Sequence, residues 1–453
     1  MLFSLTNPEV AIMMMGIFLF AVLLGFPIAF TLMAMGLGFG YYAYFDPTKM
    51  EHLFDNRIFQ LFVQNTYTVM DNNVLTAVPL FLFMGYLVER AGIVAKLFFA
   101  IRLASHKLPA SMAVAALITC TLFSTATGII GAVVTLMGLL AWPAMVKAGY
   151  DKKFASGIIC SGGCLGILIP PSIMLIVYSV IAQLSPLRLF AAAIFPGLML
   201  AGLYISYAVF RAWLNPSIAP KPSAEEIPPP SVIMREVLVS FLPLFSLIIL
   251  VLGTILAGIA TPAEAAAVGA FGALVLSYFY KTLKWKNFKE SVFLTAKTTA
   301  MIMWLFIGSW TFASVFSYLG GHEVFEHFFK SLNLQPWQFL VITQIIIFLL
   351  GWPLEWTEIL IIFVPIFLPL VEFFGVNPYF FAMLIALNLQ TSFLTPPMAM
   401  SAYYLKGVQS KNVELMQIFS GIMPFLGIVI LAMVLMYLFP GIALWLPETL
   451  FAN

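Results

Sequence analysis

The feature that most constrains this chain is a pair of prolines inside an apolar segment, Pro170 and Pro171 in the run 166–172. A proline has no backbone N–H group and disfavours helix at the residue before it, so a helix that reaches this point should break. In lipid, each freed backbone group costs on the order of several kcal/mol unless a polar partner satisfies it. The sequence therefore predicts a broken helix whose carbonyl and amide groups face something polar.

The same pattern occurs a second time. The pair Pro396–Pro397 follows the first pair at an offset of 226 residues. This offset also relates Pro143 to Pro369 and Gly149 to Gly375. Four matches at one spacing indicate two copies of a broken-helix unit, an arrangement typical of membrane transporters built from repeats.

The composition indicates a membrane protein. Hydrophobic residues make up 62% of the 453 and charged residues only 9%, so the expected class is an all-α polytopic membrane protein. The net charge of +2 is small and dispersed, which argues against nucleic acid as a partner. The N-terminus has no basic region, so the first apolar run is expected to be a membrane span rather than a cleaved signal. The cysteines, which all lie in apolar runs, are expected to be packing residues: Cys120, Cys160 and Cys164.

The first repeat, residues 1–213, is expected to contain a re-entrant hairpin. No residue between Lys107 and Lys147 is charged, and the limb 108–123 has 16 residues. That limb spans about 24 Å, which is short of the ~30 Å hydrocarbon core. Residues 108–147 are therefore expected to form an inward-opening hairpin with a polar tip, followed by a broken helix at about 152–182. The other expected elements are two spans within 9–44, a polar loop at 46–73, a span at 74–89, an interfacial amphipathic helix at 93–105 and a span at 188–213.

The second repeat, residues 236–453, is expected to have the same order. A proline-rich linker at 214–235 joins the two halves. The second hairpin is expected at about 337–373, and its first limb, 337–350, is too short to cross a bilayer. The other expected elements are spans at about 236–259, 263–280 and 295–318, an interfacial stretch at 322–333, a broken helix at about 377–405 and a last span at 413–440.

The distribution of positive charge predicts the orientation. Sixteen lysines and arginines fall on one side of this arrangement and four on the other, so the richer side, with the linker, is expected in the cytoplasm. The first hairpin then opens inward and the second outward. Because each half crosses the membrane an odd number of times, the two repeats are inverted, as in alternating-access carriers.

Oxygen-bearing side chains gather at each tip and each break. The first tip offers Ser124, Thr125 and Thr127, and the break that follows offers free carbonyls. The second tip offers Thr357 with Glu355 and Glu358, and the second break offers Thr391, Ser392 and Thr395. Hard oxygen donors suit a Group 1 cation, and soft ligands for other metals are absent. The alternative is that these hydroxyls merely bond neighbouring backbone; the pairing of a tip with a break, twice at one offset, favours a site.

No lysine or arginine lies within either tip or break. An anionic substrate would therefore be held by helix N-termini, hydroxyls and co-bound cations. Ser172 is a candidate for such a contact, with packing as its alternative role. Glu355 and Glu358 are candidates for cation ligands or proton carriers; the alternative is that the second tip lies near the outer surface and both are solvated.

Three motifs carry a family resemblance. The segments Cys164–Ser172, Gly258–Ala265 and Thr391–Met398 together resemble the large membrane subunit of tripartite ATP-independent periplasmic (TRAP) transporters, DctM type, and the resemblance covers nearly the whole chain. It implies a sodium-coupled importer of a small organic acid in the bacterial inner membrane, working by an elevator movement, and not an enzyme. It also implies two partners, a periplasmic substrate-binding protein and a small membrane subunit of about four spans on a separate chain.

The resemblance also implies positions for the ligands. One sodium site would join Ser124, Thr125 and Thr127 with Gly166, Ile167, Leu168 and Pro170. A second would join Trp356, Thr357 and Glu358 with Thr391, Ser392 and Thr395. Substrate would bind between the tips, near Ser124, Ser172 and Thr395. The chain departs from the family at the second tip, where hydroxyl or amide residues are expected in place of the two glutamates, and in the loop 46–73, which is longer than in many members.

Each alternative function requires different features of the sequence. A single-component carrier like the divalent-anion/sodium symporters would share the inverted hairpins but would transport without a binding protein. An intramembrane enzyme would need a catalytic dyad or metal set, and the sequence offers neither. A channel would need a continuous pore, whereas broken helices paired with hairpins suit occlusion.

Overall fold

The computed structural model describes residues 6–48, 50–220, 229–409 and 412–451, and within these ranges the chain is helical with no β-strand. The prediction of an all-α protein is confirmed. The helices of the first half are α1 (Asn7–Leu23), α2 (Ile28–Ala43), α3 (Arg57–Met70), α4 (Ala77–Arg90), α5 (Ile93–Ala104), α6 (Ser111–Thr127), α7 (Ile130–Lys147), α8 (Lys152–Cys164), α9 (Ile173–Ala182) and α10 (Pro186–Leu214), with 3₁₀ turns η1 (Leu53–Asp55), η2 (Leu165–Ile167) and η3 (Pro216–Ile218).

The helices of the second half follow in a similar order. They are α11 (Pro230–Leu256), α12 (Pro262–Phe279), α13 (Trp285–Tyr318), α14 (Gly321–Ser331), α15 (Pro336–Leu350), α16 (Trp356–Glu358), the π-helical turn η5 (Ile359–Phe363), α17 (Val364–Phe373), α18 (Pro378–Leu394), α19 (Met400–Val408), α20 (Leu415–Leu438) and α21 (Gly441–Leu450).

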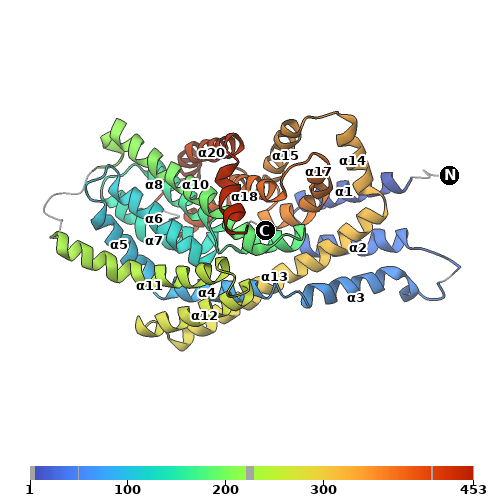
Figure 1. Ribbon diagram of the computed structural model, residues 1–453, viewed down its shortest axis with the longest axis horizontal. Helices are drawn as coiled ribbons and strands as arrows, with labels where there is room; N and C mark the ends of the chain where they lie inside the picture. Colours follow the sequence, from blue (N-terminus) through green and yellow to red (C-terminus); the bar gives the residue numbers. More distant parts are fainter. Residues whose placement is uncertain (1–5, 49, 221–228, 410–411, 452–453) are drawn as a thin grey trace.

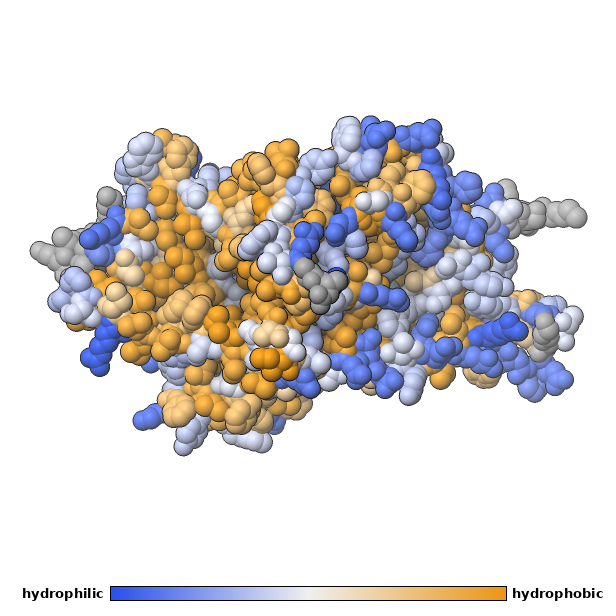
Figure 2. All heavy atoms as spheres, in the orientation of Figure 1, coloured by the Kyte–Doolittle hydropathy of each residue, from blue (hydrophilic) through white to orange (hydrophobic). Residues whose placement is uncertain are grey.

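Seven segments of the described chain are long and apolar enough to cross a membrane, which supports the polytopic class. They are α7, α10, α11, α12, α13, the segment Trp356–Phe373 and α20. The pair α4 and α5, which is bent by 64° at residues 91–92, would add an eighth span. Figure 2 shows apolar side chains over the left and middle of one face, and hydrophilic side chains over its right end.

Two helices that follow the expected hairpins begin with similar caps, and the cap residues lie 226 positions apart. Asp151 caps α8 by accepting a hydrogen bond from the Phe154 N–H, and Asn377 caps α18 in the same way from the N–H groups of Tyr379 and Phe380. Side chains of this kind satisfy amides that a helix N-terminus leaves unpaired. In Figure 1 the first hairpin, α6 and α7, lies to the left of the centre, and the second, α15 to α17, lies to the right. The inverted relation of the repeats stays a prediction.

Helix α8, which follows the first hairpin, is held by close packing. A Cβ atom at Gly157 of α8 would lie 2.1 Å from the Gly421 carbonyl oxygen of α20, and one at Gly421 would lie 2.0 Å from the Lys153 oxygen. No side chain fits at either position, so the two backbones touch, as small residues allow in membrane helices. This contact fixes α8 against α20 just before the first break.

Two sequence expectations differ from the structure. Residues 57–70 of the expected polar loop 46–73 form α3 instead, because Ile58 and Val69 are buried on one face while Gln60 and Gln64 stay exposed on the other. The structure also begins α11 at Pro230, inside the predicted linker 214–235, because proline suits the first turn of a helix. Residues 221–228 of that linker lie outside the described residues.

Candidate functional site

The first tip is a tight turn between α6 and α7. Gly128 adopts a left-handed conformation (φ +61°), and its N–H group donates to the Ser124 carbonyl oxygen at 2.8 Å. Glycine takes this conformation without strain, so it ends α6 sharply. The predicted ligands Ser124, Thr125 and Thr127 therefore occupy the last helical turn of α6, and all three are buried.

The first break lies between α8 and α9. After α8 ends at Cys164, the chain forms the 3₁₀ turn η2, passes through a cis peptide bond between Pro170 and Pro171, and starts α9 at Ile173. Residues 165–172 are buried throughout. Ser172 Oγ donates to the Ile167 carbonyl oxygen at 2.5 Å, so its hydroxyl hydrogen bridges the break and leaves only its oxygen lone pairs for a ligand.

The structure brings the first tip and the first break into contact. A Cβ atom at Gly166 would lie 3.2 Å from Ser124 Cβ and 3.3 Å from Ser124 Oγ. Gly166 therefore lies against the tip, and Ile167, Leu168 and Pro170 follow it in the same buried segment. On the other side, Gly85 of α4 packs directly on the Thr127 backbone, because a Cβ there would lie 2.8 Å from the Thr127 oxygen.

One hydroxyl of the first tip has no partner. Thr125 Oγ1 donates to the Leu122 oxygen at 2.7 Å, and Thr127 Oγ1 donates to the Phe123 oxygen at 3.1 Å. Ser124 Oγ is fully buried and makes no hydrogen bond with the described residues. A buried hydroxyl without a partner costs about 1–3 kcal/mol. An ion that this oxygen coordinates would offset that cost.

The second tip meets the end of α18 in a similar way. A Cβ atom at Gly351, just after α15, would lie 2.9 Å from Ser392 Cβ. The hydroxyls of the second break bond within their own helix: Thr391 to the Asn388 oxygen, Ser392 to the Leu389 oxygen and Thr395 to the Thr391 oxygen. Helix α18 continues to Leu394, whereas α8 ends at Cys164, which corresponds to position 390 at the 226-residue offset. The second helix therefore ends closer to its proline pair than the first.

Thr357 and Glu358 of the second tip are buried, and each has a side-chain oxygen without a hydrogen-bond partner among the described residues. Their exposed fractions are 3% and 5%, and neither Thr357 Oγ1 nor Glu358 Oε2 makes a hydrogen bond with the described residues. The alternative that both glutamates are solvated is therefore wrong for Glu358, whereas Glu355 and Trp356 are half-buried. No lysine or arginine stands between Lys330 and Lys406 in the sequence to balance this carboxylate.

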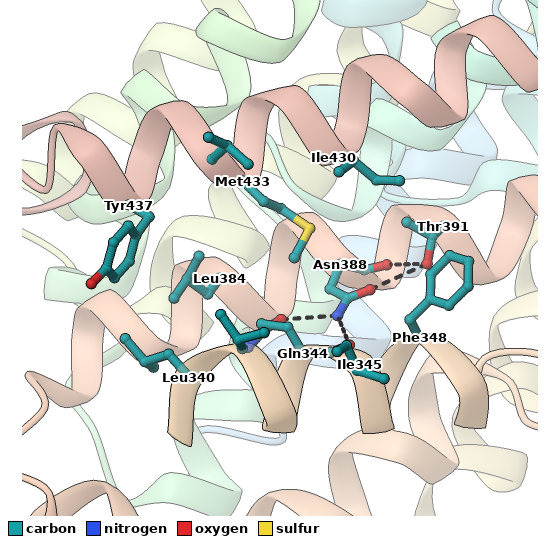
Figure 3. Close-up of a pocket in the computed structure, with 12 residues that line it drawn as sticks. Leu340, Gln344, Ile345, Phe348, Leu384, Asn388, Thr391, Ile430, Met433 and Tyr437 are labelled. Atoms are coloured by element: carbon teal, nitrogen blue, oxygen red, sulfur yellow. Dashed lines mark hydrogen bonds between the residues drawn. The ribbon is translucent and has the colours of Figure 1, made fainter. Parts of the chain in front are cut away.

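The two candidate sites share α9 as a neighbour. This helix, which begins directly after Ser172, packs against α16, η5 and α18 of the second half as well as against η2. The predicted substrate residues Ser172 and Thr395 lie directly before α9 and directly after α18, two helices that contact each other. Sequence reasoning missed a buried amide pair beside the second site, in which Asn388 Nδ2 donates to the Gln344 side chain at 2.9 Å (Figure 3). The sequence feature that could have indicated this pair is the occurrence of Gln344 and Asn388 in otherwise apolar helical segments.

Replacing Ser124 by alanine should separate a ligand from a packing residue. The substitution removes a buried hydroxyl that has no partner, so the variant should unfold at the same or a higher temperature in sodium-free buffer. If the oxygen binds sodium, the rise in unfolding temperature on adding sodium should need about tenfold more of the ion. The control is Thr119→Ala, which removes another buried, unpartnered hydroxyl of α6. An unchanged sodium response in Ser124→Ala would exclude it as a ligand.

Comparison with protein families gives one match over most of the chain. The model described as "Tripartite ATP-independent periplasmic transporter, DctM component" matches residues 15–442. The C4-dicarboxylate TRAP transporter large permease protein DctM of Pseudomonas aeruginosa is 29% identical over 85% of this chain and 88% of its own length. The sialic acid TRAP transporter large permease protein SiaM of Vibrio cholerae is 30% identical over 84% of this chain and 87% of its own. The isethionate TRAP transporter permease protein DctMQ of Oleidesulfovibrio alaskensis is 28% identical over 84% of this chain, which covers 59% of that protein.

Two solved transporters share the fold. The Alcanivorax borkumensis YdaH transporter superimposes with a TM-score of 0.62 over 96% of this chain and 99% of its own, at 15% identity. Neisseria gonorrhoeae MtrF superimposes with a TM-score of 0.55 over 98% of this chain and 96% of its own, at 13% identity. At these identities the likeness extends to the fold alone.

Proposed function

The chain belongs to the DctM family of TRAP transporter large permeases, and from that premise we propose that it is the membrane subunit of a sodium-coupled importer of a small organic anion. It is a transporter permease and not an enzyme. The observation that carries sodium coupling is the buried, unpartnered Ser124 oxygen, which packs on Gly166 where a hairpin tip meets a broken helix. Oxygen ligands of this kind suit a small hard cation.

A sodium ion would balance the buried oxygen atoms of each site, which have no cationic side chain nearby in the sequence. The first site offers hydroxyl and carbonyl oxygens with no charged side chain, and the second offers the Glu358 carboxylate with no nearby lysine or arginine in the sequence. A bound cation satisfies the buried oxygens and supplies positive charge for an anionic substrate near Ser172 and Thr395. Substrate and ion then stabilise each other's binding, which is the coupling that a symporter needs.

The proposed movement is of the elevator type. The hairpins α6–α7 and α15–α17 pack with the helices of the two breaks, and α8 is fixed to α20 by the Gly157–Gly421 contact. We assign these elements to the moving body and α11, α12 and α13 to the static scaffold. The two hairpins would act as the inner and outer gates of the same site.

The proposed partners follow from the family. The relatives named above transport C4-dicarboxylates, sialic acid and isethionate by their names, so the substrate proposed here is a small organic acid selected by a periplasmic binding protein. The proposed small membrane subunit, of about four spans, is a separate polypeptide. The proposed location is the bacterial inner membrane, with the linker 214–235 in the cytoplasm.

Reconstitution tests this proposal against a single-component carrier. The ligand of the cognate binding protein is identified by mass spectrometry after purification. The chain and its small subunit are then placed in proteoliposomes with a sodium gradient and the labelled ligand. The proposal predicts uptake only when the binding protein is present. Uptake at the full rate without it would overturn the tripartite assignment and favour the divalent-anion/sodium symporter-like carrier.

A further inference from the structure

A buried hydrogen bond joins the second hairpin to α13. Ser309 Oγ of α13 donates to the Ile361 carbonyl oxygen of η5 at 3.1 Å. The two residues have exposed fractions of 0% and 1%, so water does not compete for either atom. In the proposed movement α13 belongs to the static scaffold and the second hairpin to the moving body. The bond therefore connects the two bodies that have to slide past each other.

A proline explains why the Ile361 carbonyl takes a donor from another helix. In an α-helix this oxygen would accept from the N–H group of residue 365. Residue 365 is a proline, which has no N–H group and whose ring pushes against the carbonyl four residues earlier. The chain forms the π-helical turn Ile359–Phe363 at this point, a distortion that is frequent at functional sites. The carbonyl has lost its α-helical donor, and Ser309 supplies one from α13.

Ser309 behaves differently from the hydroxyl residues that follow it in α13. Thr311 and Ser314 each donate to the carbonyl oxygen four residues earlier in the same helix, at 2.8 and 2.7 Å. This local bond is a common choice for serine and threonine within helices. Ser309 has the same option on its own helix but donates to the hairpin instead. If the hairpin moved away, the Ser309 hydroxyl could turn back to α13.

The two partners therefore lose different amounts when they separate. A hydrogen bond requires the two oxygens to lie about 3 Å apart, so a displacement of the hairpin by one helical turn, about 5.4 Å, breaks it. Ser309 then recovers a partner in its own helix, whereas the Ile361 carbonyl loses the donor that replaced the missing amide. A buried carbonyl without a donor is costly inside a membrane. The bond thus favours the arrangement of hairpin and scaffold seen in this structure.

We propose that the hydrogen bond between Ser309 and Ile361 is a latch that holds the moving body in one of its two positions and breaks once in each transport cycle. This inference rests on the proposed function, because a latch requires the second hairpin to move relative to α13. Neither residue belongs to a candidate ion site, so the latch controls the movement and not the binding of sodium.

A distance measurement across the two bodies tests the latch. Spin labels are attached to cysteines that replace Lys286 at the start of α13 and Glu372 near the end of α17, both of which are exposed. The native cysteines are buried, so the labels react at the introduced positions. The chain and its small subunit are placed in nanodiscs, and the distribution of distances between the labels is measured by pulsed electron resonance in sodium and in choline. The ratio of the two distances reports how much of the protein is latched.

Ser309→Ala should lower the ratio of latched to unlatched protein by at least about threefold, because it removes the donor and leaves the carbonyl unpaired in both positions. The matched control is Ser314→Ala, which removes a hydroxyl that bonds its own helix and should leave the ratio unchanged. Pro365→Ala restores an amide for the Ile361 carbonyl and should also lower the ratio. Adding Ser309→Ala to Pro365→Ala should then change the ratio by less than about twofold, because both substitutions act on one bond.

The outcomes separate the latch from the proposed function. Two distances whose ratio is the same in the native and Ser309→Ala proteins would overturn the latch and leave the elevator movement in place. A single distance in every variant, in sodium and in choline, would overturn the elevator movement and the latch together. Sodium-coupled uptake is measured separately, so a loss of coupling would not change how the distances are interpreted.

Discussion

Gly166→Leu should abolish sodium-dependent uptake while leaving the chain folded. The first side-chain atom alone would lie 3.2 Å from Ser124 Cβ and 3.3 Å from Ser124 Oγ, so the leucine must push the tip of the first hairpin away from the break. Overpacking of this kind costs about 1–3 kcal/mol. The ligand oxygens would separate by more than a sodium site tolerates, and we expect uptake and sodium binding to fall by at least about tenfold.

The matched control is Gly202→Leu. A Cβ atom at Gly202 of α10 meets nothing within 4 Å, so the leucine should point outward and leave uptake unchanged. Sodium binding is measured for both variants as the sodium-induced rise in unfolding temperature, with choline at the same ionic strength as the reference. A Gly166→Leu protein with native sodium binding and native uptake would show that the contact between tip and break is only packing.

Glu358→Gln should weaken sodium binding at the second site and at the same time stabilise the sodium-free protein. The carboxylate is 5% exposed, and its Oε2 atom has no hydrogen-bond partner within the described residues. Burial of an unpaired charge is costly, so the neutral amide should raise the unfolding temperature in choline buffer. In sodium the amide lacks the charge that holds the ion, and the half-saturating sodium concentration should rise at least about tenfold.

Glu372→Gln provides the control for that variant. Glu372 lies in the same hairpin near the end of α17 and is exposed, so its neutralisation should change neither the unfolding temperature in choline nor the sodium response. If Glu358→Gln keeps the native sodium response and the native unfolding temperature, the carboxylate is neither a sodium ligand nor a buried charge. The second site would then depend on hydroxyl and backbone oxygens alone.

The sequence predicted where the helix ends at the first break better than at the second, for a physical reason. Gly128 and the Pro170–Pro171 pair act on the local backbone, and local effects of this kind can be read from residue type. The second break contains the same prolines, but α18 stays helical through Leu394. Each hydroxyl there donates to a backbone carbonyl three or four residues earlier. The spacing of the prolines does not indicate whether these hydroxyls bond the backbone or remain available to a ligand.

Tertiary packing accounts for most of the remaining differences. Glu358 is buried in α16, a short element that contacts α9 from the other half of the chain, and the sequence alone left its solvation open. Helix α3 was missed because its buried residues, Ile58 and Val69, lie eleven residues apart among exposed glutamines and threonines. The amide pair of Gln344 and Asn388 joins residues 44 positions apart, and no local pattern indicates such a contact.

Replacement of sodium tests the central claim most directly. The chain, its small subunit and the ligand-loaded binding protein are reconstituted in proteoliposomes, and uptake is measured with sodium outside and again with choline in its place at constant pH. The account predicts that choline lowers the initial rate at least about tenfold, and that the Ser124→Ala and Glu358→Gln proteins need more sodium to reach half of their maximal rate. Equal rates in sodium and choline would contradict it.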